Sequence, residues 1–150
     1  MQRAIDLSLE NVRAGVGGPF AALVVRGGEI LATGTNQVTA LQDPTAHAEV
    51  VAIRGACQVA HSFQLPDCDL YTTCEPCPMC MGAIYWARLG RVYYANTRDD
   101  AAKIGFDDSF IYDQLLLPLG SRKIAMIPLM REAALEAFRE WEKSQTKVKY

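Results

Sequence analysis

The stretch YTTCEPCPMCMG, residues 71–82, holds three of the chain's five cysteines, Cys74, Cys77 and Cys80. An odd number of cysteines with three crowded together does not suggest a disulfide framework, and such a cluster more often binds a metal or takes part in catalysis. The fold must then bring the remaining ligand to these sulfurs from another part of the chain. Whether two or three of the sulfurs bind the metal decides most of what the chain can do.

Hydrophobic periodicity and turn residues predict alternating strands and helices. The expected elements, in chain order, are a helix over 1–15, strands over 21–25 and 29–35, a helix over 47–60, a strand over 69–73, a helix over 78–89, strands over 91–95 and 121–129, and a helix over 130–143. This order predicts one α/β domain over 1–150, a three-layer α/β/α sandwich with a mixed sheet of about five strands that is parallel in its second half. One apolar face of the last helix is expected to point inward; it consists of Met130, Ala134, Phe138 and Trp141.

Two of these helices begin with residues that can bind zinc. His47 begins the helix over 47–60, whereas Cys77 and Cys80 begin the helix over 78–89 with a spacing that places both sulfurs on one face. The partial positive charge at a helix N-terminus favours thiolate over thiol. One imidazole and two thiolates leave the fourth tetrahedral position for water, which is the arrangement of catalytic zinc, so we expect one Zn²⁺ per chain.

Cys74 raises an alternative, because a third sulfur would complete a Cys3His shell in which the metal only stabilises the fold. The chain would then be a structural or binding module and not an enzyme. Cys74 stands before Glu75-Pro76, at the end of a strand and not on the helix. This position favours a small apolar residue that packs beneath the site.

Glu49 also argues for a catalytic site. A capping box that starts at Thr45 would need its acidic residue at position 48, which is Ala48, so capping does not explain Glu49. In the first turn of the helix, Glu49 and His47 can both reach across the open helix end. A carboxylate beside zinc-activated water can take its proton and return the proton to a leaving amine.

His-x-Glu at 47–49 followed by Pro-Cys-x-x-Cys at 76–80 is the signature of zinc-dependent nucleobase deaminases, and it is far more specific than either half alone. The sequence resembles the cytidine deaminase-like superfamily, and within it the bacterial guanine deaminases. The resemblance covers most of the chain. It is densest in GGPF (17–20), DPTAHAEV (43–50), CEPCPMCMGAIYWAR (74–88), GFDDSFIY (105–112) and the terminal Tyr150.

This resemblance implies zinc-dependent hydrolytic deamination of guanine at C2, which yields xanthine and ammonia. Glu49 would be the catalytic acid and base, and Asp108 a second carboxylate that binds the substrate and shuttles protons. Carboxylate and amide acceptors would satisfy the N–H donors of guanine. The resemblance also implies six substrate-binding residues. Asn36 would hydrogen-bond the ring, Ala48 would bind the substrate through its backbone N–H, and Asp108 would bind the base. Phe20 would pack against the ring, Trp86 would form a pocket wall, and Tyr150 would close over the site.

The same resemblance implies a homodimer in which the C-terminal segment is exchanged, so that Tyr150 caps a partner's site. Guanosine deaminases share much of the pattern and are the nearest alternative, and tRNA adenosine deaminases are a more distant one. A net charge of −2 offers no basic surface for nucleic acid, so no nucleic-acid partner is expected. No stretch approaches the roughly 18 apolar residues of a membrane helix. The N-terminal region has no apolar signal core, which predicts a cytoplasmic protein.

Overall fold

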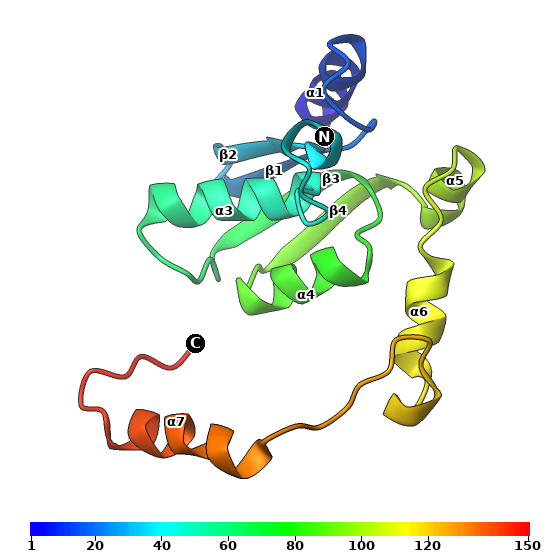
Figure 1. Cartoon of the computed structure of the whole chain (residues 1–150). Helices are drawn as coiled ribbons and strands as arrows, with labels where there is room; N and C mark the ends of the chain where they lie inside the picture. Colours follow the sequence, from blue (N-terminus) through cyan, green and yellow to red (C-terminus); the bar gives the residue numbers. More distant parts are fainter. The chain divides into compact units, whose positions relative to one another are not determined.

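The computed structural model describes every residue, 1–150 (Figure 1). The chain forms two compact units, 1–108 and 109–150. The first unit holds the sheet, the buried core and the cysteine cluster, whereas the second consists of helices and their connections. The expectation of one domain over 1–150 stays a prediction.

Four strands form one sheet in the order β2-β1-β3-β4. They are β1 (Ala21–Arg26), β2 (Glu29–Thr35), β3 (Cys68–Cys74) and β4 (Arg91–Asn96). β1 runs antiparallel to β2 and β3, and β3 runs parallel to β4, so the sheet is mixed and parallel in its second half, as predicted. The predicted fifth strand over 121–129 is wrong. A strand is stable only when another strand pairs with its backbone, and the unit that contains this segment has no strand.

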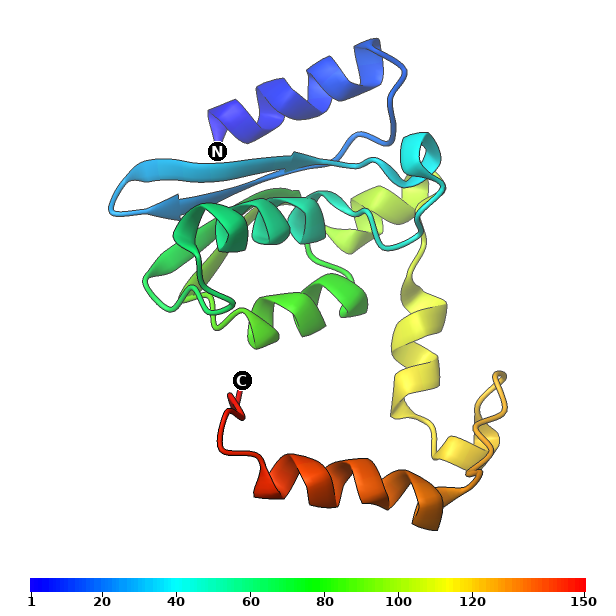
Figure 2. The ribbon, with the colours of Figure 1, turned by 60° about the vertical axis from the view of Figure 1, so that its left-hand side comes forward.

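Helices cover both faces of the sheet. α1 (Gln2–Arg13) lies on one face, and α3 (Ala48–Ala60) and α4 (Pro78–Trp86) lie on the other (Figure 2). α4 forms the crossover between the parallel strands β3 and β4. The predicted three-layer α/β/α arrangement is therefore confirmed. None of the helices combines the length and the apolar character needed to cross a membrane.

The core lies between the sheet and its helices. Its largest fully buried side chains are those of Leu65, Leu70, Val24, Thr72, Cys68 and Cys80. α3 packs closely on β2 because position 34 is a glycine: a Cβ atom at Gly34 would lie 2.2 Å from the carbonyl oxygen of Ala48. Ala48 is the first residue of α3, so this contact fixes the start of the helix against the sheet.

Two short helices in the first unit were not predicted, α2 (Val38–Leu41) and α5 (Arg98–Lys103). Both are shorter than two turns, so neither shows a hydrophobic period in the sequence. α5 does carry a local start signal, because the Thr97 side chain accepts a hydrogen bond from the Asp100 N–H and the Asp100 carboxylate accepts one from the Thr97 N–H. This reciprocal pair is a capping box.

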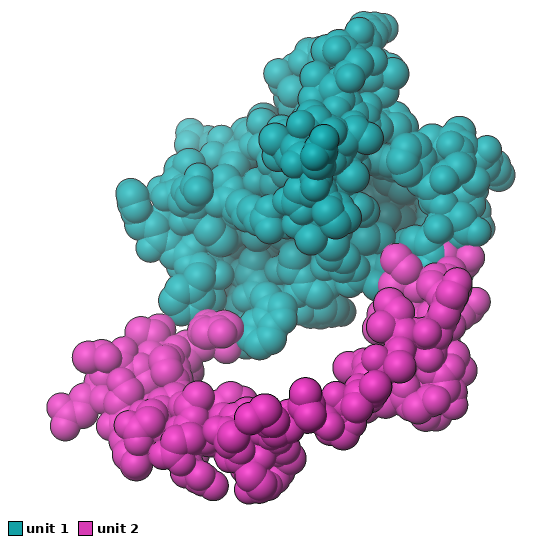
Figure 3. All heavy atoms as spheres, in the orientation of Figure 1, with its two compact units in different colours: residues 1–108 teal, residues 109–150 magenta.

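The second unit, magenta in Figure 3, contains α6 (Ser109–Leu116), a 3-10 turn (Leu119–Ser121) and α7 (Arg131–Lys143). α7 confirms the predicted last helix. The second unit does not bury the apolar face of this helix, since Phe138 is 70% exposed, Trp141 is 47% exposed and no residue of α7 is buried. The expectation that this face points inward stays a prediction. A unit of this size cannot bury enough apolar surface to form its own core.

Candidate metal centre and active site

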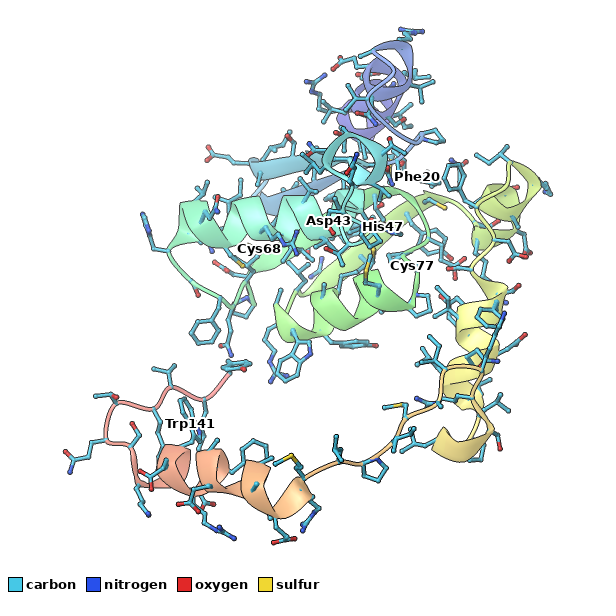
Figure 4. The ribbon with its side chains drawn as sticks, viewed as in Figure 1. Phe20, Asp43, His47, Cys68, Cys77 and Trp141 are labelled. Carbon is cyan, nitrogen blue, oxygen red and sulfur yellow. The ribbon has the colours of Figure 1, made fainter.

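Two helix starts bring the candidate ligands together. His47 immediately precedes α3 and Cys77 immediately precedes α4, and both have an extended backbone. The loop before His47 is a tight turn in which the Asp43 carboxylate accepts hydrogen bonds from the backbone N–H and the hydroxyl of Thr45, at 2.8 and 2.7 Å. Figure 4 shows His47 and Cys77 side by side where the two helices begin.

The spacing of the three donor atoms fits zinc. Nδ1 of His47 lies 3.6 Å from Sγ of Cys77 and 3.6 Å from Sγ of Cys80, and the two sulfurs are 3.6 Å apart. Zinc binds sulfur at about 2.3 Å and nitrogen at about 2.0 Å, so a tetrahedral ion separates its ligand atoms by roughly 3.5 to 3.8 Å. The structure thus brings the three predicted ligands to the distances that this metal requires.

The protonation of the cluster also suits a soft cation. The hydrogen bond between the Cys77 and Cys80 sulfurs, together with the His47 ring, lowers the pKa of Cys77 to about 4. The same hydrogen bond and burial raise the pKa of Cys80. The contact with the Cys77 sulfur raises the pKa of His47. A cation that binds here displaces the protons that these hydrogen bonds now hold.

Cys74 lies outside the three-residue group. Its side chain is buried, and its Sγ donates to the carbonyl oxygen of Thr97 at 3.5 Å. Burial raises the pKa of Cys74 to about 11, which keeps this thiol neutral. The geometry is that of a packing residue beside a three-ligand site.

Glu49 lies next to the cluster in dry surroundings. It is 5% exposed, its Oε1 accepts a hydrogen bond from Thr72 Oγ1 at 3.0 Å, and its Oε2 accepts one from Cys80 Sγ at 3.4 Å. Burial raises the pKa of Glu49, so this carboxyl group holds a proton more readily than an exposed glutamate, a property typical of a general acid and base. Thr72 was not a predicted site residue. Its one signal in the sequence is a polar side chain at a position of β3 that alternates toward the core with Leu70.

Phe20 and Asn36 flank the hairpin and meet at its end, where the Asn36 N–H donates to the Phe20 carbonyl oxygen at 3.0 Å. The side-chain oxygen of Asn36 accepts from the backbone N–H groups of Gly18 and Val38, both at 3.4 Å. Because its side-chain oxygen is occupied, Asn36 offers its side-chain NH2 as a donor, and its role in binding the substrate ring stays a prediction. The Phe20 ring packs edge-on against Phe106, with centroids 4.9 Å apart.

The remaining predicted residues are spread more widely. Ala48 is buried at the start of α3. Burial and the nearby Cys77 sulfur raise the pKa of Asp108, the last residue of the first unit. Trp86 is 60% exposed at the C-terminal end of α4, and Tyr150 belongs to the second unit. The substrate-binding roles of these four residues stay predictions.

A cavity of about 260 Å³ borders the site on the side of Phe20 and Cys74. Asn96 and Asp100 add polar groups to its lining. The three candidate zinc ligands are not part of this lining, so the cavity does not contain them.

The family model of the cytidine and deoxycytidylate deaminase zinc-binding region matches residues 1–96. The chain belongs to this family. His47, Cys77 and Cys80 all fall within the matched residues of the deaminase domain. Zinc is accordingly the metal that both the family and the ligand geometry indicate.

Known relatives of this deaminase domain include the guanine deaminase of Bacillus subtilis, which is 51% identical over 150 residues that cover 100% of this chain and 96% of the relative. The X-ray structure of guanine deaminase from Bacillus subtilis matches with a TM-score of 0.96 and 52% identity, over 99% of this chain and 95% of that chain. A structure of guanine deaminase from Nitrosomonas europaea matches with a TM-score of 0.68 and 32% identity, over 91% and 69% of the respective chains. A tRNA-specific adenosine deaminase of Agrobacterium fabrum is 46% identical over 76 residues, 51% of this chain and 50% of the relative.

Proposed function

We propose that this protein is a zinc-dependent guanine deaminase that hydrolyses guanine to xanthine and ammonia. One observation carries the proposal: the match to the guanine deaminase of Bacillus subtilis runs over the whole chain, including the second unit. The tRNA-specific adenosine deaminase of Agrobacterium fabrum matches over only 76 residues. The full-length match therefore favours guanine over an RNA substrate.

The chemistry follows from Glu49 and its neighbours. Zinc, when bound, would lower the pKa of a coordinated water towards ~7. Glu49 takes a proton from the attacking water and passes it to the amino group on C2 of guanine. A C–O bond forms at C2, the C–N bond breaks, and ammonia leaves. Because Thr72 holds Oε1, the proton moves on Oε2, the oxygen on the cluster side.

Recognition of guanine needs donors and acceptors on its polar edges. The Asn36 NH2 and the Ala48 backbone N–H are donors for the carbonyl oxygen and the ring nitrogen acceptors. The Asp108 carboxylate is an acceptor for the N–H groups. A ring with donors where guanine has acceptors would leave these protein groups without hydrogen-bond partners. The resulting loss of binding free energy is larger than that from a missing apolar contact. The apolar walls are assigned to Phe20, Trp86 and Tyr150.

A substrate panel tests this assignment. The protein is incubated with guanine, guanosine, cytosine, cytidine and an adenosine-containing tRNA stem-loop, and released ammonia is measured. We expect turnover of guanine, with xanthine as the second product. Turnover confined to guanosine would replace our substrate with the nucleoside. Turnover of the stem-loop would move the chain to the RNA class, against its net charge of −2.

The metal assignment has its own test, in which zinc is counted per chain. We expect one ion in the wild type, one in Glu49→Ala, and none in Cys77→Ser. Glu49→Ala should lose about 10²- to 10⁴-fold in kcat, the usual contribution of a general acid and base. Cys74→Ser should keep its zinc. If it loses zinc as readily as Cys77→Ser does, the closed Cys3His shell is correct and the catalytic site is not.

We further propose that the chain is a cytoplasmic homodimer that exchanges its C-terminal segment. All five cysteines are free, which suits a reducing compartment. If the protein were found to be secreted, with its thiols oxidised and its zinc lost, the cytoplasmic location would be wrong. The second unit exposes apolar side chains that a second copy of the chain would cover. The Tyr150 ring then closes the partner's site.

A complementation experiment tests the exchange. One chain carries Glu49→Ala with Tyr150 intact, and the other keeps Glu49 but lacks Tyr150. Each homodimer should be nearly inactive. After the two are unfolded and refolded together, mixed dimers contain one site with both residues, so activity should return. Absence of recovery would assign Tyr150 to the site of its own chain.

A further inference from the structure

Asn11 is a buried polar residue of α1 that the proposed reaction does not use. It is 6% exposed. Its side-chain NH2 donates two hydrogen bonds of 3.0 Å, one to the carbonyl oxygen of Gly18 and one to the carbonyl oxygen of Asn36. Both protons of the amide are thereby used. Asn11 thus joins α1, the loop before β1 and the chain that follows β2.

The segments joined by Asn11 also hold the side chain of Asn36. The Asn36 Oδ1 atom accepts from the N–H groups of Gly18 and Val38, but both distances are 3.4 Å, which is long for a hydrogen bond. Bonds of this length keep an amide oriented only while the backbone on both sides stays in place. The approach is close, since a Cβ atom at Gly17 would lie 2.2 Å from the Asn36 carbonyl oxygen.

We propose that Asn11 is a positioning residue that directs the Asn36 amide towards the substrate. It holds the carbonyl groups of Gly18 and Asn36, and so keeps the Gly18 N–H aimed at the Asn36 oxygen. The Asn36 NH2 then faces the ligand as a donor. Without Asn11 the amide can rotate and present its oxygen to the acceptors of the base. The inference rests on the proposed function for the identity of the substrate only.

The expected signature is a change in KM with little change in kcat. Asn11→Leu removes both donors at similar volume, and Asn11→Ala removes them while leaving room for water, in case the leucine variant does not fold. We expect the KM for guanine to rise about five- to tenfold, the effect of roughly one hydrogen bond, with kcat within about twofold. The zinc content should stay unchanged, because His47, Cys77 and Cys80 lie on other elements.

Ser8→Ala is the matched control. Ser8 lies on the same helix and is 8% exposed, but its hydroxyl donates to the Ile5 carbonyl oxygen within α1. Removal of this hydroxyl should leave the KM within about twofold of wild type. An equal rise in KM in Ser8→Ala would show that α1 acts through general stability, and would overturn the proposal.

A double-mutant cycle separates positioning from support of the fold. If Asn11 acts through Asn36, Asn11→Leu should change the KM by less than about twofold in an Asn36→Ala background. If the rise in KM caused by Asn11→Leu and the rise caused by Asn36→Ala multiply in the double variant, Asn11 does not act through Asn36 and the proposal is wrong.

Amide hydrogen exchange tests the same contact without any substrate. In Asn11→Leu, the backbone N–H groups of Gly18, Asn36 and Val38 should exchange about tenfold faster than in wild type and in Ser8→Ala. Unchanged exchange would overturn the positioning role. If the wild type fails to deaminate guanine but the exchange result holds, the proposed function fails and the contact stands, so the two failures are distinguishable.

Discussion

Both units of this chain contain large apolar side chains, but only the first unit buries residues. In the first unit, 1–108, buried residues run from Ala4 on α1 to Ala101 on α5. In the second unit, 109–150, no residue is buried, although it contains large apolar side chains. Among these are Leu116, Ile127 and Phe138, which are 85%, 81% and 70% exposed.

The difference shows that an amphipathic pattern predicts a helix but not the surface that the helix packs against. α3 and α7 are both 13 residues long, and the sequence pattern predicts both. α3 buries residues on the sheet of its own unit, whereas α7 buries none. Since most of the stability of a protein helix comes from packing of its apolar face, α7 needs a surface that the second unit lacks.

The largest expected effect is a clash in the first unit. Gly34→Ala would place a Cβ atom 2.2 Å from the Ala48 carbonyl oxygen and 2.5 Å from the Ala52 nitrogen, both of them backbone atoms. We expect a loss of about 3 kcal/mol or more in the free energy of unfolding, since neither strand nor helix can move alone. The measurement is denaturant unfolding. In the second unit, Gly120→Ala meets no atom within 4 Å and should be nearly neutral. Equal losses in both variants would contradict the contrast between the units.

The next effect tests what covers α7. Phe138→Ser should cost about 2 kcal/mol, the value of burying such a side chain, if a second copy of the chain covers it. The loss should depend on protein concentration, because association would supply the burial. Unfolding is followed at two concentrations a hundredfold apart. The control is Glu140→Ser, on the opposite side of α7. This variant removes an exposed ion pair with Lys143 and should lose little stability. A loss below about 0.5 kcal/mol for Phe138→Ser would leave the face uncovered.

Much of the first unit was predictable because its elements carry strong local signals. Gly27 and Gly28, which both adopt positive φ, mark the hairpin turn, and Pro78 marks the start of α4. Each predicted element there also has a partner in the same unit. The fifth strand failed for the opposite reason: residues 124–129 are apolar, but strand pairing depends on a neighbouring strand that the sequence pattern does not specify.

The candidate site divides in the same way. The cluster of His47, Cys77 and Cys80 was predictable, because its ligand types and spacing are visible in short segments. The hydrogen bond from Thr72 to Glu49 joins residues 23 positions apart, and that from Asn11 to Asn36 joins residues 25 positions apart. No short segment of the sequence shows which residue each of them pairs with. Polar contacts across the fold therefore had to come from the structure.

Thr72→Val is a smaller change that tests the first of these contacts. The valine keeps the shape of the fully buried threonine but removes the hydroxyl that holds Glu49 Oε1. We expect kcat to fall about tenfold, equivalent to about 1.4 kcal/mol, with KM and zinc content unchanged. Thr72→Ser should restore most of the rate. Thr73→Val is the control, because Thr73 is also buried but its hydroxyl oxygen accepts from the Ala21 N–H. A loss of rate in Thr73→Val as large as in Thr72→Val would remove the special role of Thr72.

Loss of the α5 capping box should have a smaller effect on stability. Thr97→Ala removes the side chain that accepts from the Asp100 N–H and should cost about 1 kcal/mol at neutral pH. Lys103 and the Thr97 hydrogen bonds lower the pKa of Asp100 from 3.8 to about 2. The stabilisation from this carboxylate is therefore present above about pH 4 and is lost as the pH falls towards 2. Unfolding measured from pH 7 to pH 2 should show the difference between the variant and the wild type narrowing, by the part that the Thr97 hydroxyl contributes through its hydrogen bond to the Asp100 carboxylate. A constant difference over this range would contradict the role of Asp100.

The smallest effect has the opposite sign. Gly82 is an exposed position in α4, with a φ outside the positive range, where an added Cβ atom would meet nothing within 4 Å. Gly82→Ala should stabilise the protein by about 0.5–1 kcal/mol, because glycine loses more backbone entropy in a helix than alanine does. Thermal unfolding measures the gain. The position also probes the contrast between the units, because α4 carries the exposed Tyr85 and Trp86 next to it. If Gly82→Ala destabilises the protein at concentrations where it associates, another chain packs closely on α4, and the first unit does not provide all of its own burial.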